Sequence, residues 1–198
     1  WTDCTGGALL NTEFGATGDV ATLERQTALF ETALVPWTFW SYDEQFVHDL
    51  ADPATGANVN DAVVDALARP HPVAVAGTPV GADYDPEGGA YQLVWSTTGP
   101  DGSRFGDGAT TVIDTNARAY PAGYDVVVDG GQVTSAPNDP RLTVVADPGA
   151  DRVQVLVGRA GDPGPAAVEP VAPPAAACPV FPTATVPTPV AAAPAFTG

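Results

Sequence analysis

The stretch ALLNTEFG (residues 8–15) decides the fold of the first part of this chain. It is a short apolar run that ends at a glycine and carries one carboxylate, Glu13, near its end. A run of this length that is bounded by a turn residue is typical of a buried strand in a parallel sheet. We therefore predict a strand over residues 8–14 whose C-terminal end presents Glu13.

A helix and a second strand are expected directly after this stretch. Asp19 is a suitable N-cap for a helix over residues 20–33, in which apolar side chains recur at helical spacing. Residues 35–42 (VPWTFWSY) then form a β-rich aromatic run. Pro36 stands near the start of this run, where it removes no ladder hydrogen bond. The pattern predicts strand, helix and strand in succession.

A second helix is predicted over residues 61–69, with Asn60 as its cap and Pro70 as its end. The resulting order, strand–helix–strand–helix, is that of the last quarter of a (β/α)8 barrel, in which functional residues stand at the C-terminal ends of strands. Parallel units of this kind also occur in many other folds. The order alone therefore leaves the architecture open.

From residue 79 onward the pattern changes to short β-branched segments with turn residues between them. Seven segments at this spacing predict an antiparallel β-sandwich. They are PVGADYD, AYQLVWSTT, TTVID, YDVVVD, QVTS, LTVVAD and RVQVLVG. Turn residues at 85–89 and 129–131 predict hairpins, the first between PVGADYD and AYQLVWSTT and the second between YDVVVD and QVTS.

The composition divides the chain into three parts. Residues 1–77 are expected to be a C-terminal barrel portion, residues 78–160 a β-sandwich, and residues 161–198 a disordered or polyproline-like tail rich in Pro and Ala. The sequence contains no Met and opens without a signal peptide. We therefore expect the chain to be a fragment of a longer protein.

The charge composition argues against several classes of partner. The chain has 24 acidic residues against 7 basic ones, for a formal net charge of −17. Such a surface repels phosphate backbones and anionic lipid headgroups, so we expect no nucleic-acid partner and no electrostatic membrane anchor. No apolar run approaches the roughly 18 residues of a membrane-spanning helix. A neutral or sugar ligand remains open.

Cysteine and histidine give no signal for a metal or a cofactor. Cys4 and Cys178 are too few for a disulfide framework and lack metal-ligand spacing. His48 and His71 have no Cys, Asp or Glu around them at such spacing. Neither a Gly-rich phosphate loop nor a Ser-His-Asp grouping is present. We expect no cofactor and no metal.

Several motifs carry a resemblance to a known family. LNTEFGA (residues 10–16) resembles the seventh-strand motif of glycoside hydrolase family 5, and WTFWSY (residues 37–42) resembles its eighth strand. The later segments resemble the endoglycoceramidase branch, in which a β-sandwich follows the barrel. These segments are RPHP (69–72), AGTP (76–79), YPAGY (120–124) and VTSAPN (133–138). His71 departs from the branch, which has Tyr at this place.

The resemblance implies a retaining β-glycosidase that acts on glycosphingolipids or related glycolipids, with Glu13 at the position of the nucleophile. An ionised carboxylate there attacks the anomeric carbon and forms a glycosyl-enzyme that water then hydrolyses. The second carboxyl group, about 5 to 5.5 Å away, acts first as acid and then as base. In the family that residue comes from the fourth barrel strand, which this chain lacks. The resemblance therefore also implies a secreted or cell-surface enzyme. We expect this enzyme to be a monomer and its C-terminal fragment to be inactive alone.

Trp40 is the first candidate for substrate binding. It matches the aromatic residue at the end of the last barrel strand, where an indole face stacks on the sugar next to the scissile bond. Period-two alternation places Trp40 on the face of the strand opposite to Trp37 and Phe39. The alternative is that all three aromatic side chains lie in the core.

Tyr42 and Glu44 are further candidates for the mouth of the same pocket, together with Asp43. Charged residues in a loop are, however, more often simply solvated.

For Glu13 the alternative is a strand-end carboxylate that is satisfied by a helix N-terminus or an Arg.

Three other functions are compatible with the sequence. The chain could belong to a family 5 enzyme that acts on another β-glucoside or a polysaccharide. The sandwich could instead be a non-catalytic module that binds a carbohydrate or lipid surface through its aromatic residues, which are Tyr84, Tyr91, Trp95, Tyr120 and Tyr124. The alternating pattern of the strands that carry them favours the other interpretation, in which these aromatic side chains are core or corner residues. A wall-associated protein with a functional tail is the third possibility, and the intact TEFG motif argues against it.

Overall fold

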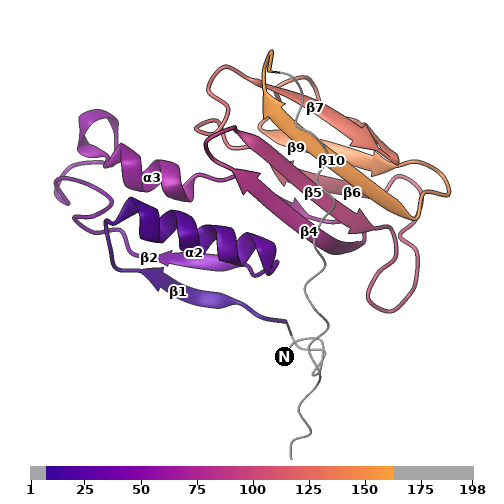
Figure 1. Cartoon of the computed structure of the whole chain (residues 1–198), viewed down its shortest axis with the longest axis horizontal. Coiled ribbons are helices and arrows are strands. Elements are labelled where there is room, and N and C mark those ends of the chain that lie inside the picture. The colour runs from indigo at the N-terminus through magenta and orange to yellow at the C-terminus, as the bar shows by residue number, and fades with distance from the viewer. Residues whose placement is uncertain (1–7, 163–198) are drawn as a thin grey trace, which may run out of the picture. The chain divides into compact units, whose positions relative to one another are not determined.

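The computed structural model describes residues 8–162 (Figure 1). Cys4, Cys178 and almost all of the expected tail lie outside these residues. In the described part, no helix is long and apolar enough to cross a membrane.

The first part of the chain has the predicted strand–helix–strand–helix order. Its elements are β1 (Asn11–Gly15), α2 (Val20–Thr32), β2 (Trp37–Trp40), a 3-10 turn (Gly56–Asn58) and α3 (Asp61–Leu67). Strands β1 and β2 are parallel, with Phe14 opposite Phe39 and Gly15 opposite Trp40. These elements are a parallel unit of the expected kind, while the complete barrel remains a prediction.

The two predicted helix caps behave differently. The Asp19 carboxylate accepts a hydrogen bond from the Thr22 backbone N–H at 2.7 Å, and this bond lowers the pKa of Asp19. Asn60 also precedes its helix, but its side chain makes no capping hydrogen bond. Its amide instead donates to the Gln45 carbonyl at 2.9 Å, which ties the preceding loop to the start of α3. Helix α3 is also shorter than predicted, since it ends at Leu67.

A small aromatic core holds β1, β2 and α2 together. Phe14 is 8% exposed and lies at its centre. Its ring makes edge-to-face contacts with Phe30, Trp37 and Phe39, at centroid distances of 5.0, 5.0 and 5.8 Å. Leu23 adds a fully buried side chain from α2 to the same cluster. The side chains of β1 and β2 that face α2 therefore form the core.

The remainder of the described chain is an antiparallel β-sandwich, which confirms the predicted class. Its two sheets have the strand orders β4-β5-β10-β7 and β3-β6-β9-β8. The strands are β3 (His71–Ala74), β4 (Thr78–Asp85), β5 (Ala90–Ser96), β6 (Thr110–Asp114), β7 (Tyr124–Asp129), β8 (Gly131–Val133), β9 (Arg141–Ala146) and β10 (Arg152–Arg159). Buried side chains from both sheets, among them Trp95, Ile113 and Leu142, meet in one core.

The sandwich begins earlier than the sequence pattern indicates. Strand β3 was not predicted, and it lies inside the range 1–77 that was expected to belong to the barrel portion. It pairs with β6, with a register irregularity between Pro72 and Ala74. The pattern missed this strand because a proline in a short segment normally argues against pairing, whereas β3 stands at a sheet edge, where a missing N–H is tolerated.

One of the two predicted hairpins is wrong. The turn at residues 85–89 joins the antiparallel neighbours β4 and β5, and the Gly89 N–H donates to the Asp85 carbonyl at 2.7 Å. The turn at residues 129–131, by contrast, joins strands of different sheets, because β7 pairs with β10 while β8 pairs with β9. Turn chemistry predicts the change of chain direction, but the pairing is decided by the rest of the sandwich.

Candidate active site

Glu13 lies in the middle of β1, immediately before the buried Phe14, and its own side chain is exposed. The two strand ends beyond it are held close together. A Cβ atom on Gly15 would lie 2.4 Å from the Phe39 ring and 2.7 Å from the Trp40 carbonyl oxygen, so only glycine fits here. The Ala16 N–H donates to the same Trp40 carbonyl at 2.8 Å. The backbone that carries Glu13 is thus fixed against the end of β2.

Trp40 ends β2 on the exposed face. Trp37 and Phe39 are half-buried against Phe14, whereas Thr38 and Trp40 point away from this core. The indole of Trp40 is 56% exposed. The alternation that the sequence predicts is confirmed, and it leaves an aromatic face available on the strand next to Glu13.

The loop after Trp40 is held in a turn by hydrogen bonds to Asp43. The Asp43 carboxylate accepts from the Gln45 N–H at 2.9 Å, and its carbonyl accepts from the N–H groups of Phe46 and Val47. Asp43 therefore forms the turn. Tyr42 is 53% exposed and contacts the ring of Phe46 at a centroid distance of 5.7 Å.

The predicted site residues are therefore distributed over two neighbouring strands and one loop. Glu13 and Trp40 occupy adjacent parallel strands, Tyr42 follows directly after β2, and Glu44 is exposed farther along the loop. In the described residues, no hydrogen bond, ion pair or ring contact joins these four side chains to one another. Among residues 8–162, no group of three or more His, Cys, Asp or Glu could hold a metal ion.

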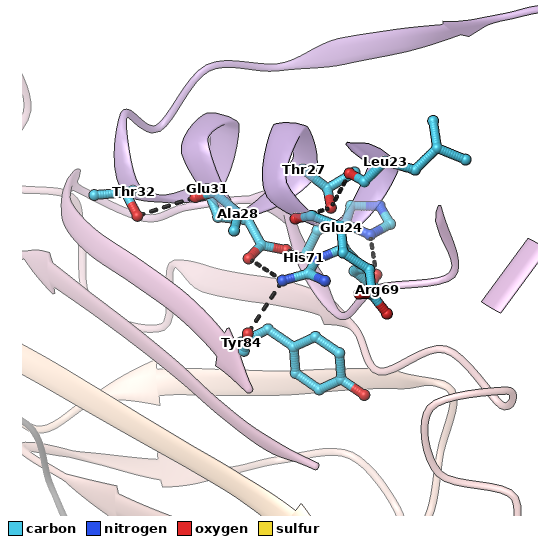
Figure 2. A network of polar contacts seen from close by, with 9 residues as sticks. All are labelled: Leu23, Glu24, Thr27, Ala28, Glu31, Thr32, Arg69, His71 and Tyr84. Atoms are coloured by element: carbon cyan, nitrogen blue, oxygen red, sulfur yellow. Dashed lines mark hydrogen bonds and ion pairs between the residues drawn. The ribbon is translucent and has the colours of Figure 1, made fainter. Parts of the chain in front are cut away.

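A buried ion pair that the sequence did not predict connects α2 with the sandwich (Figure 2). Arg69 donates from Nε and Nη2 to the two carboxylate oxygens of Glu31, at 2.5 and 2.8 Å. Nη2 also donates to the Tyr84 carbonyl at 3.1 Å, and the guanidinium carbon lies 4.9 Å from the centroid of the Tyr84 ring. The side chains of Arg69 and Glu31 are only 3% and 10% exposed. No local pattern indicates a pair whose members are 38 residues apart.

Burial dominates the electrostatics of this pair. It raises the pKa of Glu31, and the hydrogen bond and charge of Arg69 oppose that rise only in part. His71 lies at the edge of the same network, where its Nδ1 is 3.0 Å from the Arg69 carbonyl oxygen. This ion pair thereby joins helix α2, the segment after α3 and strand β4.

The aromatic residues considered for a carbohydrate-binding face lie in the core, as the alternating strand pattern favoured. All five lie in the sandwich core, with between 1% and 8% of each side chain exposed, and they are Tyr84, Tyr91, Trp95, Tyr120 and Tyr124. The Tyr124 hydroxyl, for example, donates to the Asp139 carbonyl at 2.8 Å. The core position of these five side chains confirms the interpretation that the alternating pattern favoured, and it argues against a carbohydrate-binding face built from them.

Comparison with known proteins shows that the chain is similar to glycoside hydrolases. Residues 69–157 match the family model described as the glycoside hydrolase family 5 C-terminal domain. The chain is 35% identical over 156 residues to endoglycoceramidase I of Rhodococcus hoagii (strain 103S). The match covers 77% of this chain and 28% of that relative, so the chain spans little more than a quarter of its length.

Solved structures show the same relationship. The lactosyl-enzyme intermediate of endo-glycoceramidase II from Rhodococcus sp. matches with a TM-score of 0.54 and 26% identity, over 78% of this chain and 34% of that chain. Sterylglucosidase 1 of Cryptococcus neoformans matches with the same TM-score of 0.54 at 15% identity, over 73% of this chain and 24% of that one. The second likeness concerns the fold alone.

Proposed function

Because this chain is a relative of the endoglycoceramidases of glycoside hydrolase family 5, we propose that it is the C-terminal part of a retaining β-glycosidase. In this proposal the enzyme hydrolyses the O-glycosyl bond of glycosphingolipids or related glycolipids. Glu13 is its nucleophile, and the acid/base carboxyl group stands on a barrel strand that precedes this chain.

The observation that carries the proposal is the exposed Glu13 carboxylate on a parallel strand whose neighbour ends in the exposed indole of Trp40. A carboxylate in this place can attack an anomeric carbon, while the indole face accepts the apolar face of a sugar ring. A covalent route is also supported by the similar structure of endo-glycoceramidase II, which is a lactosyl-enzyme intermediate. Tyr42 and Glu44 would then border the sugar site.

The chain supplies only one of the two carboxyl groups that such a mechanism needs. We therefore propose that residues 1–198 are inactive alone, and that the complete enzyme is a monomer that is secreted or attached to the cell surface. The acidic composition suits a neutral glycan substrate better than a phosphorylated one, because the net charge of −17 repels anions.

The full-length enzyme tests this function directly. Fluorescent lactosylceramide, glucosylceramide and an aryl β-cellobioside are incubated with it, and proton NMR follows the anomer that is released first. We expect release of the whole glycan from ceramide with the β anomer as the initial product, since two displacements retain configuration. Initial release of the α anomer, or activity on the cellobioside without activity on either lipid, would contradict the proposal.

Trp40 has its own expected effect. In the full-length enzyme, Trp40→Ala should lower kcat/KM for lactosylceramide about 2- to 12-fold, because an aromatic stacking contact contributes roughly 0.5–1.5 kcal/mol. Trp40→Phe should lower kcat/KM less than Trp40→Ala does, because a smaller aromatic ring remains. Phe105→Ala serves as the matched control, because Phe105 is an exposed aromatic residue (47%) in a sandwich loop and should leave kcat/KM unchanged. Equal effects of the Trp40→Ala and Phe105→Ala substitutions would refute a role for Trp40 at the sugar site.

A further inference from the structure

The pairing register of β1 and β2 shifts between Asn11 and Phe14. Over this interval β1 has two residues, Thr12 and Glu13, where β2 has only Thr38. One extra residue in one strand of a pair is a β-bulge, which bends the strand and re-aims a side chain, and bulges are common next to active sites. Thr12 and Glu13 are both exposed at this place. The direction of the Glu13 side chain therefore depends on how the bulge is held.

A hydrogen bond from a side chain of β2 holds the bulge. The Thr38 hydroxyl donates to the Thr12 carbonyl oxygen at 2.5 Å. This carbonyl belongs to the same planar peptide group as the Glu13 N–H, so the bond restrains the orientation of the peptide from which Glu13 starts. Threonine suits the position, because its β-branch restricts χ1 and so limits the directions in which the hydroxyl can point.

The backbone after Glu13 is anchored by other contacts. Phe14 is buried and packs its ring against Phe30 of α2. Gly15 lies so close to β2 that a Cβ atom on it would collide with the Phe39 ring. Glu13 is thus held from both sides, by packing after it and by the Thr38 hydroxyl before it.

We propose that Thr38 is a positioning residue whose hydrogen bond to the Thr12 carbonyl fixes the bulge, so that the Glu13 carboxylate has the orientation required for attack on the anomeric carbon. This inference rests on the proposed function, in which Glu13 is the nucleophile. Trp40 follows Thr38 on the same exposed face of β2 and is the residue proposed to contact the sugar. The single hydroxyl proton of Thr38 is engaged by Thr12, so Thr38 acts through Glu13 rather than on the substrate.

Thr38→Val in the full-length enzyme tests the inference, because valine keeps the shape and the β-branch but cannot donate. We expect kcat for lactosylceramide to fall about 10- to 100-fold, the scale of a misplacement of about 1 Å at a reacting group. KM should stay close to the parent value, since an interaction that acts only in the transition state lowers kcat and kcat/KM equally. Thr38→Ser retains the hydroxyl and should recover most of the lost kcat. Initial rates over a range of substrate concentrations give both constants.

Thr134→Val is the matched control. The Thr134 hydroxyl also donates to a backbone carbonyl, that of Thr143 at 3.3 Å, but it does so in the sandwich, and its loss should leave kcat unchanged. Thermal melts of the three variants should stay close to that of the parent enzyme, because the Thr38 bond is exposed and water can replace it.

Several results would overturn the role of Thr38. They are unchanged kcat in Thr38→Val, a raised KM at unchanged kcat, no recovery in Thr38→Ser, an equal loss in Thr134→Val, or a large fall in the melting temperature of Thr38→Val. Glu13→Gln, assayed in parallel, separates this inference from the proposed function. An active Thr38→Val beside an inactive Glu13→Gln refutes the role of Thr38 alone, whereas an active Glu13→Gln refutes the proposed nucleophile itself.

Discussion

Glu13→Gln in the full-length enzyme is expected to lower kcat for lactosylceramide at least about 10,000-fold, the scale seen when a covalent nucleophile is removed. Glutamine keeps the size and the backbone environment of Glu13 but cannot form the glycosyl ester. The exposed position of the side chain on β1 implies that folding is unaffected, so the melting temperature should not change. Initial rates of glycan release and a thermal melt check the two expectations together.

A control and a rescue give this prediction its specificity. Glu87→Gln makes the same chemical change at an exposed turn of the sandwich and should leave kcat unaltered. In Glu13→Ala, added azide can enter the space of the lost carboxylate and attack the anomeric carbon of an aryl β-glycoside, which gives an α-glycosyl azide. A β-glycosyl azide would instead mark Glu13 as the acid/base residue, and undiminished turnover of Glu13→Gln would remove it from the mechanism.

Local patterns predicted the elements around Glu13 because these elements depend on neighbouring residues. Residues only a few positions apart determine the Asp19 cap, the apolar spacing of α2 and the alternation from Trp37 to Trp40. Even the exposure of Trp40 follows from a period of two, once Trp37 and Phe39 are known to face Phe14.

The missed features depend on residues that are distant in sequence. Strand β3 exists because β6 offers it an edge, despite Pro72. The chain crosses between the sheets at residues 129–131 because β7 pairs with β10 in one sheet, whereas β8 pairs with β9 in the other. A single sequence indicates which secondary structure each segment favours, but not which distant segment it packs or pairs with. For the same reason, the ion pair between Glu31 and Arg69 was not predicted.

Breaking this centre is expected to have the largest effect on stability. Glu31→Leu leaves the guanidinium of Arg69 buried without a counter-charge, and it should lower the free energy of unfolding by about 3–5 kcal/mol. The double variant Glu31→Leu/Arg69→Met should recover most of that loss, because two apolar side chains of similar volume need no pairing. Arg118→Met is the surface control: Arg118 is 39% exposed beside Asp61 and Asp65, and its loss should cost less than about 1 kcal/mol. Urea unfolding of the 198-residue chain measures all of these changes.

The pH dependence distinguishes the two halves of the pair. Burial raises the folded-state pKa of Glu31 above its unfolded value, so its protonated form favours the folded chain below the unfolded pKa, and this contribution is lost as the pH rises through the folded pKa. In Arg69→Met no cation opposes that rise, so the destabilisation should be small in acid and should grow towards neutral pH. Glu31→Leu removes the titrating group, so its own stability should not vary with pH through this group, and its deficit relative to the parent chain should be greatest in acid and shrink as the pH rises through the folded pKa of Glu31. Parallel pH profiles for the two single variants would show that the pair does not control how α2 is joined to the sandwich.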